Sequence, residues 1–352
     1  MFAIVAERYQ YVVGVDTHAQ KHVATIVNSR GVVLASREIR VTGPQMNSFL
    51  TWIRKVTDNA EAVLLAIEGT SSYGETLTKL ALASGFVVAE VKPPKTKSRG
   101  GDGKTDRIDA ELAALSVLRL PVSKLIIPRD GTMRKSLRIL LTARRGMVMR
   151  RTAEKQTLIA LLRGCDLGID ARKALTPKQY TEIAKWETGV GDDQEQAIAR
   201  FEAKRLATGI VESGLVLEQN EIQLAALVRA MAPELLDAPG LGPVTAAQIL
   251  CSYSHKGRVR SAAAFAALAG TTPIPASSGN VTRHRLNRFG DRALNGAIHT
   301  IALSRMQHDD TTKAYVTKRT SQGQSTREIR RSLKRYIARR LYKQLEVYNI
   351  GC

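Results

Sequence analysis

YVVGVD, residues 11–16, is the stretch that decides the fold of this chain. Its run of apolar residues predicts a buried strand, and that strand ends on an acidic residue, Asp16. Two more strand-like segments follow at residues 21–28 and 31–39, around a turn-like SRG sequence. The chain is therefore expected to begin with a meander of three strands.

The next eighty residues alternate between helical and strand-like patterns. Met46, Phe49 and Ile53 share one face of a predicted helix. Pro and Gly residues identify residues 92–105 as a loop, and Pro121 stops the last helix. The expected elements are a helix at 44–56, a strand at 62–68, a helix at 74–84, a strand at 86–91 and a helix at 106–120. This order, three strands followed by alternating helices and strands, is that of an RNase H-like α/β fold.

Four acidic residues occupy related places in this scheme. Asp16 and Glu68 close the first and fourth strands, and Asp106 and Asp109 open the last helix three residues apart. Ligands gather at strand ends in open α/β sheets. Four clustered carboxylates would repel one another, so they predict a divalent metal, Mg²⁺ or Mn²⁺. One or two such ions can assist cleavage of a phosphodiester.

Each acid also has a purely structural interpretation. Asp106 is a possible N-cap, with Asp109 in the first turn facing the helix dipole. Asp16 could simply end a strand, and Glu68 could cap the segment that follows it. His18 and His22 follow Asp16 on a turn and could contact metal or DNA, but they are expected to be partly exposed turn residues. The SRGGDGKT sequence lacks the P-loop pattern because Ser98 stands where glycine is required. ATP binding is therefore not predicted.

Charge indicates the partner. The 352 residues include 53 Lys and Arg against 32 Asp and Glu, a formal net charge of +21, which predicts a polyanion such as nucleic acid. No apolar run approaches the roughly 20 residues of a membrane span, and no signal peptide is apparent. Cys165, Cys251 and Cys352 lack zinc-site spacing, which fits a reducing cytoplasm.

The second third of the chain is predicted to be helical. Between Arg134 and Lys155 it carries eight Lys and Arg against one acid. This pattern fits either a helical hairpin with solvated charges or a partly coiled arm for dimerisation or nucleic acid. The predicted domains are an α/β catalytic domain at 1–130, a helical arm at 131–232 and a mainly helical domain at 233–352.

The C-terminal third contains three features of interest. Residues 235–250 resemble a helix-hairpin-helix segment, whose GLG turn either presents backbone N–H groups to phosphate or is a plain turn. Ser277 and Ser278 lie in a loop that precedes several arginines, and such a loop is usually only a turn. Residues 326–345 form a strongly basic helix, which favours phosphate contact.

Five motifs in order resemble one family. GVDTHAQKH, AIEGTSSYG, KTDRIDAELAA, PGLGPVTAAQIL and GTTPIPASSGN with RLNRFGDRALN are similar to the DEDD-type insertion-sequence transposases of the IS110 family. The chain looks closest to the IS1111 branch, and the family includes the Piv-type DNA invertases. The resemblance covers nearly the whole chain.

The resemblance implies a mechanism. Family members join a RuvC-like domain, through a coiled-coil arm, to a C-terminal transposase domain, and they cut and rejoin DNA. A structured bridge RNA guides them to donor and target DNA. The tetrad falls on Asp16, Glu68, Asp106 and Asp109, and the covalent serine falls on Ser278, with Ser277 as the alternative. By the resemblance, the serine domain of one protomer completes the RuvC-like site of another, which implies a dimer or tetramer. The expected location is the bacterial cytoplasm, at the nucleoid.

The leading hypothesis is therefore an RNA-guided DNA recombinase. The alternatives are a RuvC-like junction nuclease without serine chemistry and a non-catalytic nucleic-acid-binding protein. The residues expected to contact nucleic acid are Lys104, Arg107, Arg144, Arg145, Arg150, Arg151, Arg283, Arg285, Arg288, Arg331, Lys334 and Arg335.

Overall fold

The chain divides into two compact units, Met1–Arg129 and Asp130–Cys352, which are described separately. The computed structural model describes residues 3–92, 105–129, 131–187, 189, 191–276, 284, 285, 287 and 289–348. Among these residues, no helix combines the length and the apolar character that crossing a membrane requires.

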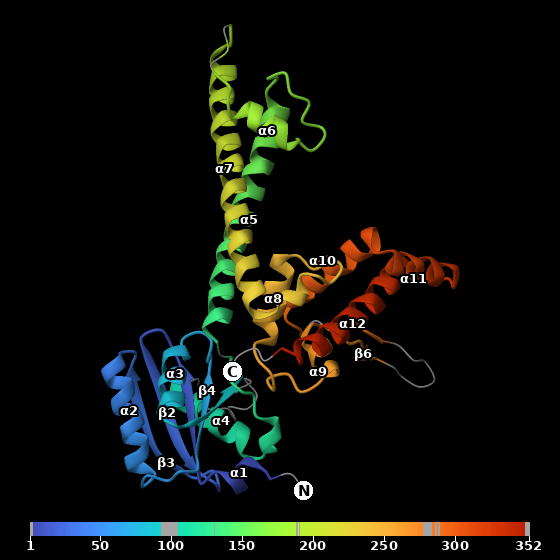
Figure 1. The fold of residues 1–352 in the computed structure, drawn as a ribbon. Helices are drawn as coiled ribbons and strands as arrows, with labels where there is room; N and C mark the ends of the chain where they lie inside the picture. Colours follow the sequence, from blue (N-terminus) through green and yellow to red (C-terminus); the bar gives the residue numbers. More distant parts are fainter. Residues whose placement is uncertain are drawn as a thin grey trace. The chain divides into compact units, whose positions relative to one another are not determined.

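The first unit has the predicted order of strands and helices (Figure 1). A short helix, α1, precedes the first strand and was not predicted. The elements are α1 (Val5–Arg8), β1 (Tyr11–Thr17), β2 (Lys21–Asn28), β3 (Val33–Arg40), α2 (Gly43–Val56), β4 (Val63–Glu68), α3 (Glu75–Ala83), β5 (Val87–Val91), α4 (Asp106–Leu118) and the short η2 (Val122–Lys124).

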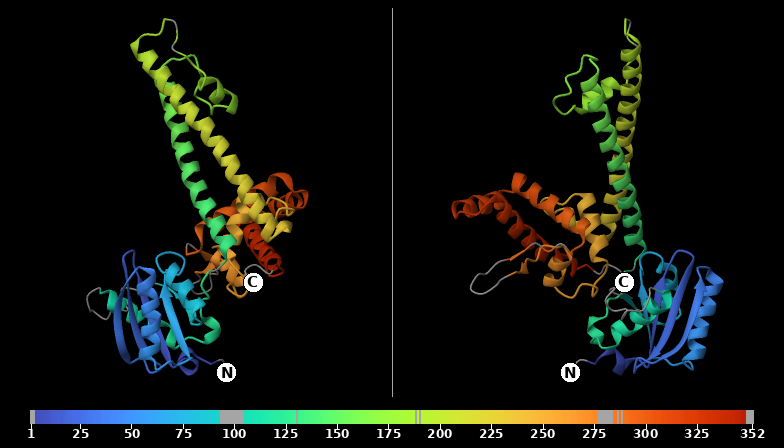
Figure 2. Two further views of the ribbon diagram at one scale, coloured as in Figure 1. Left: turned by 60° about the vertical axis from the view of Figure 1, so that its left-hand side comes forward. Right: turned by 180° about the vertical axis from the view of Figure 1, so that it is seen from behind.

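The described strands of this unit form one five-stranded sheet in the order β3-β2-β1-β4-β5. β1 is antiparallel to β2 and parallel to β4, and β4 is parallel to β5. Because side chains alternate along a strand, Val13 and Val15 face α2 and α3, whereas Val12 faces α4. The sheet is thus covered by helices on both faces (Figures 1 and 2).

Helix α4 approaches the sheet unusually closely at Gly14, in the middle of β1. A Cβ atom at Gly14 would collide with the Ala110 carbonyl oxygen and would lie 2.5 Å from the Ala114 backbone nitrogen. The facing helix residues Ala110, Ala113 and Ala114 are small and buried. The close approach depends on the missing side chain of Gly14, and it brings the first turn of α4 toward the end of β1.

The second unit begins with two long helices, α5 (Thr132–Gly164) and α7 (Gln194–Met231), which run side by side (Figures 1 and 2). A short helix, α6 (Pro177–Ile183), packs with them at one end of the pair. Nearer the other end, Arg144 donates to the Leu217 carbonyl oxygen at 2.8 Å and pairs with Glu221 at 2.8 Å. Buried Asn220 donates to the Leu140 carbonyl oxygen, so polar bonds fix the register of the two helices.

The remaining elements pack around the N-terminal end of α5 and the C-terminal end of α7. Their core joins Tyr253, Phe265, Ile298 and Ile337 to Leu224 of α7. The GLG turn leads from the short η3 (Pro233–Leu235) to α8, and Arg305 holds it by donating to the Pro239 carbonyl oxygen at 2.7 Å. The elements are α8 (Pro243–Tyr253), α9 (Ala262–Leu268), β6 (Ile274–Pro275), β7 (His284–Arg285), α10 (Arg292–His308), α11 (Asp310–Ser321) and α12 (Thr326–Leu345).

The packing at Gly14 gives a stability prediction. Gly14→Ala should lower the free energy of unfolding of the first unit by about 1–3 kcal/mol, because the added methyl group overpacks a site bounded by backbone. Urea unfolding of the full chain, followed by Trp52 fluorescence in a Trp186→Phe background, reports on this unit. Gly146→Ala is the control, since a Cβ there meets nothing within 4 Å. Equal urea midpoints for Gly14→Ala and its parent would contradict the packing argument.

Candidate metal centre

Asp16 and Glu68 lie at matching positions on neighbouring parallel strands. Each directly follows the last residue pair of the β1–β4 ladder, Val15 with Ile67. Side-chain alternation places Asp16 on the same face as Val12 and Glu68 on the same face as Ala66, and both of those residues pack against α4. The two carboxylates therefore share the sheet face that α4 covers.

Helix α4 supplies the other two acids from its first turn. Its N-cap residue is Thr105, whose hydroxyl oxygen accepts a hydrogen bond from the Ile108 N–H at 3.3 Å. The N-cap interpretation of Asp106 is therefore wrong, because Asp106 is the first helical residue. Asp109 is 5% exposed, an unusual burial for a carboxylate.

His18 joins the cluster of acids. Its Nε2 atom lies 3.1 Å from Asp16 Oδ2 and 3.6 Å from Asp106 Oδ1. One ligand atom from each of these three residues lies within 4.8 Å of the other two. The expectation of a partly exposed turn residue is confirmed for His18, whose side chain is 44% exposed, and the D-x-H spacing at the end of β1 is the sequence signal for its contact with the acids.

Burial raises the pKa of Asp16 above its usual range, and the neighbouring charges of Asp106 and Asp109 raise it further. The hydrogen bond and charge of His18 act in the opposite direction. Beside the cluster, Lys21 Nζ lies 3.9 Å from Asp106 Oδ2 and forms a closer pair with Glu38 at 2.8 Å. A group of partly buried carboxylates that repel one another is the electrostatic setting of a cation site.

His22 has a different place from the one predicted. It is fully buried on β2, so the expectation of a partly exposed turn residue is wrong for it. Its Nδ1 atom accepts a hydrogen bond from the His18 backbone N–H at 3.3 Å. Burial lowers the pKa of His22 and favours the neutral ring, which this acceptor role requires. His22 thus supports the turn that carries His18.

The segment after Glu68 folds tightly behind the strand end. The Thr17 hydroxyl donates to the Glu68 carbonyl oxygen at 3.0 Å, which ties the ends of β1 and β4 together. Gly74 packs there as well, since a Cβ on it would lie 2.8 Å from the same carbonyl oxygen. Gly74, and not Glu68, is the N-cap residue of α3.

The residues predicted to contact nucleic acid have varied surroundings. Arg107 and Arg145 are exposed, whereas Arg144 is engaged in the α5–α7 contacts described above. Arg150 lies 4.0 Å from Glu154, and Lys334 is hydrogen-bonded to Asn295. The residues that lie outside the described part of the chain are Lys104, Ser277, Ser278, Arg283 and Arg288.

The buried position of Asp16 gives a prediction about stability and metal. Asp16→Asn keeps the side-chain shape and removes a charge that burial and two acids oppose. Without metal, the variant should unfold at a higher temperature than wild type at pH 7. With Mn²⁺ at about 100 times its Kd, wild type should gain about 2.7 kcal/mol and the variant much less. Thermal scans in EDTA and in MnCl₂ measure both effects.

The pH dependence follows from the same shift. Because the pKa of folded Asp16 is raised above 3.8, the charged group destabilises the fold at higher pH. The advantage of Asp16→Asn should therefore be present at pH 7 and disappear as the pH falls below about 3.8. Equal stability of the two proteins at pH 7, with equal responses to Mn²⁺, would contradict the cluster described here.

Comparison with known proteins identifies the family. A family model for a transposase, the DEDD type of IS110 elements, matches residues 13–166. A second model, described as Transposase IS116/IS110/IS902 family, matches residues 232–317. A search of curated proteins finds no match. The two models together cover about two thirds of the sequence, with the acidic cluster inside the first. The chain therefore belongs to the IS110 family of DEDD-type transposases.

Proposed function

We propose that this transposase is an RNA-guided DNA recombinase whose first unit holds a divalent metal with Asp16, Glu68, Asp106 and Asp109. The observation that carries the proposal is the convergence of Asp16 and Asp106, from a strand and a helix far apart in sequence, onto His18. The sheet order, with β2 antiparallel to its neighbours, supports assignment of this unit to the RNase H and RuvC-like folds.

The residues present fit a hard divalent cation. Carboxylate oxygens are the ligands that Mg²⁺ and Mn²⁺ prefer, and one imidazole is compatible with Mn²⁺. Asp16 and Asp106 would hold the ion, with Asp109 and Glu68 on the same face of the sheet. When bound, the ion supplies charge stabilisation to the oxygens of a phosphodiester under attack.

The chain's own residues do the remaining work at this centre. Exposed Arg107 follows Asp106 directly and is placed to contact a DNA phosphate. Thr17 and Gly74 hold the ends of β1 and β4, so the acids keep their positions without substrate. His22 fixes the turn that places His18 between Asp16 and Asp106.

A serine completes the proposed chemistry, and this step rests on the family resemblance. The Ser278 hydroxyl oxygen attacks a DNA phosphorus atom, and the bond from phosphorus to the leaving deoxyribose oxygen breaks. The serine proton ends on that leaving oxygen. A hydroxyl of the second DNA strand then reverses the exchange and releases serine. The energy of the broken bond is retained in the serine–phosphate link, so rejoining needs no external energy source.

RNA guidance and assembly also belong to this proposal. The excess of 53 Lys and Arg over 32 Asp and Glu supports nucleic-acid binding, and the guide RNA rests on the family resemblance. We propose a structured guide RNA as the second nucleic-acid partner. A dimer or tetramer would bring the serine of one protomer to the acidic centre of another.

The metal centre is tested by two isosteric variants. Asp106→Asn and Asp109→Asn should reduce strand cleavage by at least about 100-fold, because each removes a charged metal ligand. Binding of guide RNA and DNA should stay within about twofold of wild type, since the basic surfaces are unchanged. The assay is cleavage of labelled donor DNA with purified protein, the flanking element RNA and Mg²⁺.

Glu111→Gln is the matched control for these variants, because Glu111 lies on α4 two residues after Asp109 and therefore faces a different side of the helix. Wild-type cleavage by both asparagine variants would overturn the metal-centre proposal. Metal-dependent cleavage that never yields rejoined DNA would favour the junction-nuclease alternative.

The serine is tested separately. Ser278→Ala should abolish the covalent protein–DNA species, whereas Ser277→Ala should retain at least part of it, because only Ser278 supplies the attacking oxygen. Each variant is incubated with guide RNA, DNA and Mg²⁺, denatured and examined for protein with attached DNA. If only Ser277→Ala loses the species, the assignment is off by one residue. Normal strand exchange by both variants would rule out the serine mechanism.

A further inference from the structure

We infer that the cleft between α10 and α12 is a binding site for a single strand of nucleic acid, with phosphates in the cleft and one unpaired base stacked on Phe289. The inference deepens the proposed function and rests on it for the identity of the strand, since recombination exposes unpaired DNA. The residues that carry the binding all lie in the second unit.

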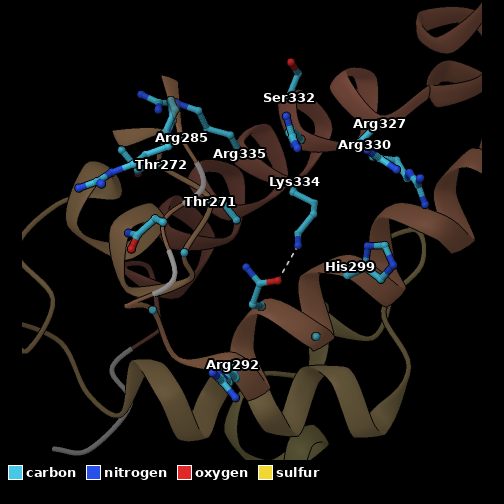
Figure 3. A pocket seen from close by; sticks show the side chains of 17 residues that line it. Thr271, Thr272, Arg285, Arg292, His299, Arg327, Arg330, Ser332, Lys334 and Arg335 are labelled. Carbon is cyan, nitrogen blue, oxygen red and sulfur yellow. Dashed lines mark hydrogen bonds between the residues drawn. The ribbon is translucent and has the colours of Figure 1, made fainter. Parts of the chain in front are cut away.

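The cleft has a volume of about 870 Å³ and a cationic lining (Figure 3). Among the described residues that line it, there is no Asp or Glu. Figure 3 shows Arg327 and Arg330 at one end, Arg285 and Arg335 at the other, and Lys334 between them. Such a lining repels cations and attracts a chain of phosphates.

The charge comes mainly from one face of α12. Arg327, Arg331, Lys334 and Arg335 recur at helical spacing and line the cleft. The opposite face is apolar and buried in the core of the unit through Ile329, Leu333, Ile337, Ala338 and Leu341. The helix is thus anchored by one face, and its cations are held at fixed positions along the cleft.

One acid lies close to these cations: hydrogen bonds with Ser325 and, to a lesser degree, the charge of Arg331 lower the pKa of Glu328. Within the described part of the chain, no ion pair joins Arg327, Arg331 or Arg335 to a carboxylate. Four cations within about two turns of one helix repel one another. Their arrangement is unfavourable in the free protein and becomes favourable when an anion with several charges enters.

Lys334 occupies the centre of the cleft and is positioned by one hydrogen bond. Its Nζ atom donates to Asn295 Oδ1 of α10 at 2.6 Å, as the dashed line in Figure 3 shows. An ammonium group has three N–H donors. The bond to Asn295 uses one of them, and the others are available to a phosphate oxygen. Desolvation lowers the pKa of Lys334, a penalty that a bound anion would offset.

An exposed aromatic ring stands at the rim of the cleft. Phe289 is 90% exposed, although its neighbours Asn287 and Gly290 line the cleft. Hydrogen bonds tie its backbone to α9, because the Asn287 side chain accepts from the Phe289 N–H at 3.0 Å and donates to the Ala267 carbonyl oxygen at 3.3 Å. A phenylalanine that is 90% exposed beside a polycationic cleft is suited to stack on a nucleobase.

The aromatic ring distinguishes a single strand from a duplex. In a duplex the faces of the bases are covered by their neighbours, so a side chain reaches them only by unstacking the helix. In a single strand each base offers a free face and successive phosphates remain available to arginine and lysine. Cations at fixed positions for the phosphates, together with Phe289 as a stacking surface for one base, are therefore suited to a single strand.

The experiment uses full-length protein and single-stranded oligonucleotides that carry 2-aminopurine at one position. Stacking on Phe289 should change the 2-aminopurine fluorescence at one register, and anisotropy should give a Kd lower for a single strand than for a duplex of the same sequence. Phe289→Ala should raise the single-strand Kd about tenfold and abolish the fluorescence change. Tyr336→Ala is the control, since Tyr336 is exposed on α12 but does not line the cleft.

The cationic part has its own variants. Lys334→Ala should weaken binding at low salt and reduce the slope of log Kd against log salt by about 0.7, the value for one phosphate contact to a single strand. Arg339→Ala, an exposed residue of α12 outside the cleft, should change neither. DNA and RNA strands are compared in parallel, and tighter binding of either one identifies the strand that the site holds.

Several outcomes would overturn the inference. Phe289→Ala could leave both the 2-aminopurine fluorescence and the Kd unchanged. Tyr336→Ala could change the fluorescence and the Kd as much as Phe289→Ala does. The wild-type protein could bind duplex more tightly than single strands. Asp106→Asn separates this inference from the proposed function, because it should lose cleavage and keep single-strand binding. Single-strand binding by a wild-type protein that never cleaves DNA would refute the recombinase proposal alone.

Discussion

The close approach of α4 to β1 at Gly14 is the constraint on which the candidate metal centre depends. A side chain at that position would collide with the helix backbone at Ala110. Gly14 and Asp16 are two residues apart on one strand, so they share a face of the sheet. Ala110 directly follows Asp109 and lies one helical turn after Asp106. The contact between Gly14 and Ala110 therefore also determines how close Asp106 and Asp109 of the helix lie to Asp16 of the strand.

In this protein of net charge +21, a cluster of acids lies in the first unit and a cluster of cations lies in the second. In the first unit, carboxylates are gathered where burial and mutual repulsion disfavour them. In the second, cations are gathered on one face of α12, where they also repel one another. Each arrangement is unfavourable alone and would become favourable with the ligand that we propose for it, a divalent cation in one unit and a nucleic-acid backbone in the other. Functional sites commonly contain such clusters of like charge, which lower stability locally.

The sequence predicted the first unit well because its signals are local. Apolar runs that end in acids marked β1 and β4, and a helical pattern after a loop rich in glycine and proline marked α4. Capping was less predictable, because Thr105 and Asp106 are both good N-cap residues and only the geometry identifies Thr105. The predicted strand at residues 21–28 already contained His22 and left His18 outside, so the expectation of a turn was wrong for His22 because it gave this strand too little weight. The role of Asn295 toward Lys334 joins residues 39 positions apart, so no local signal reveals it.

The central claim, that the acids of β1 and α4 bind a divalent metal, is tested most directly by anomalous diffraction from crystals soaked in MnCl₂. The account predicts a manganese peak in contact with carboxylate oxygens of Asp16 and Asp106, with His18 displaced from the position between them or added as a ligand. Crystals with bound manganese elsewhere but no peak at these residues, and with the bond from His18 to Asp16 retained, would contradict the account.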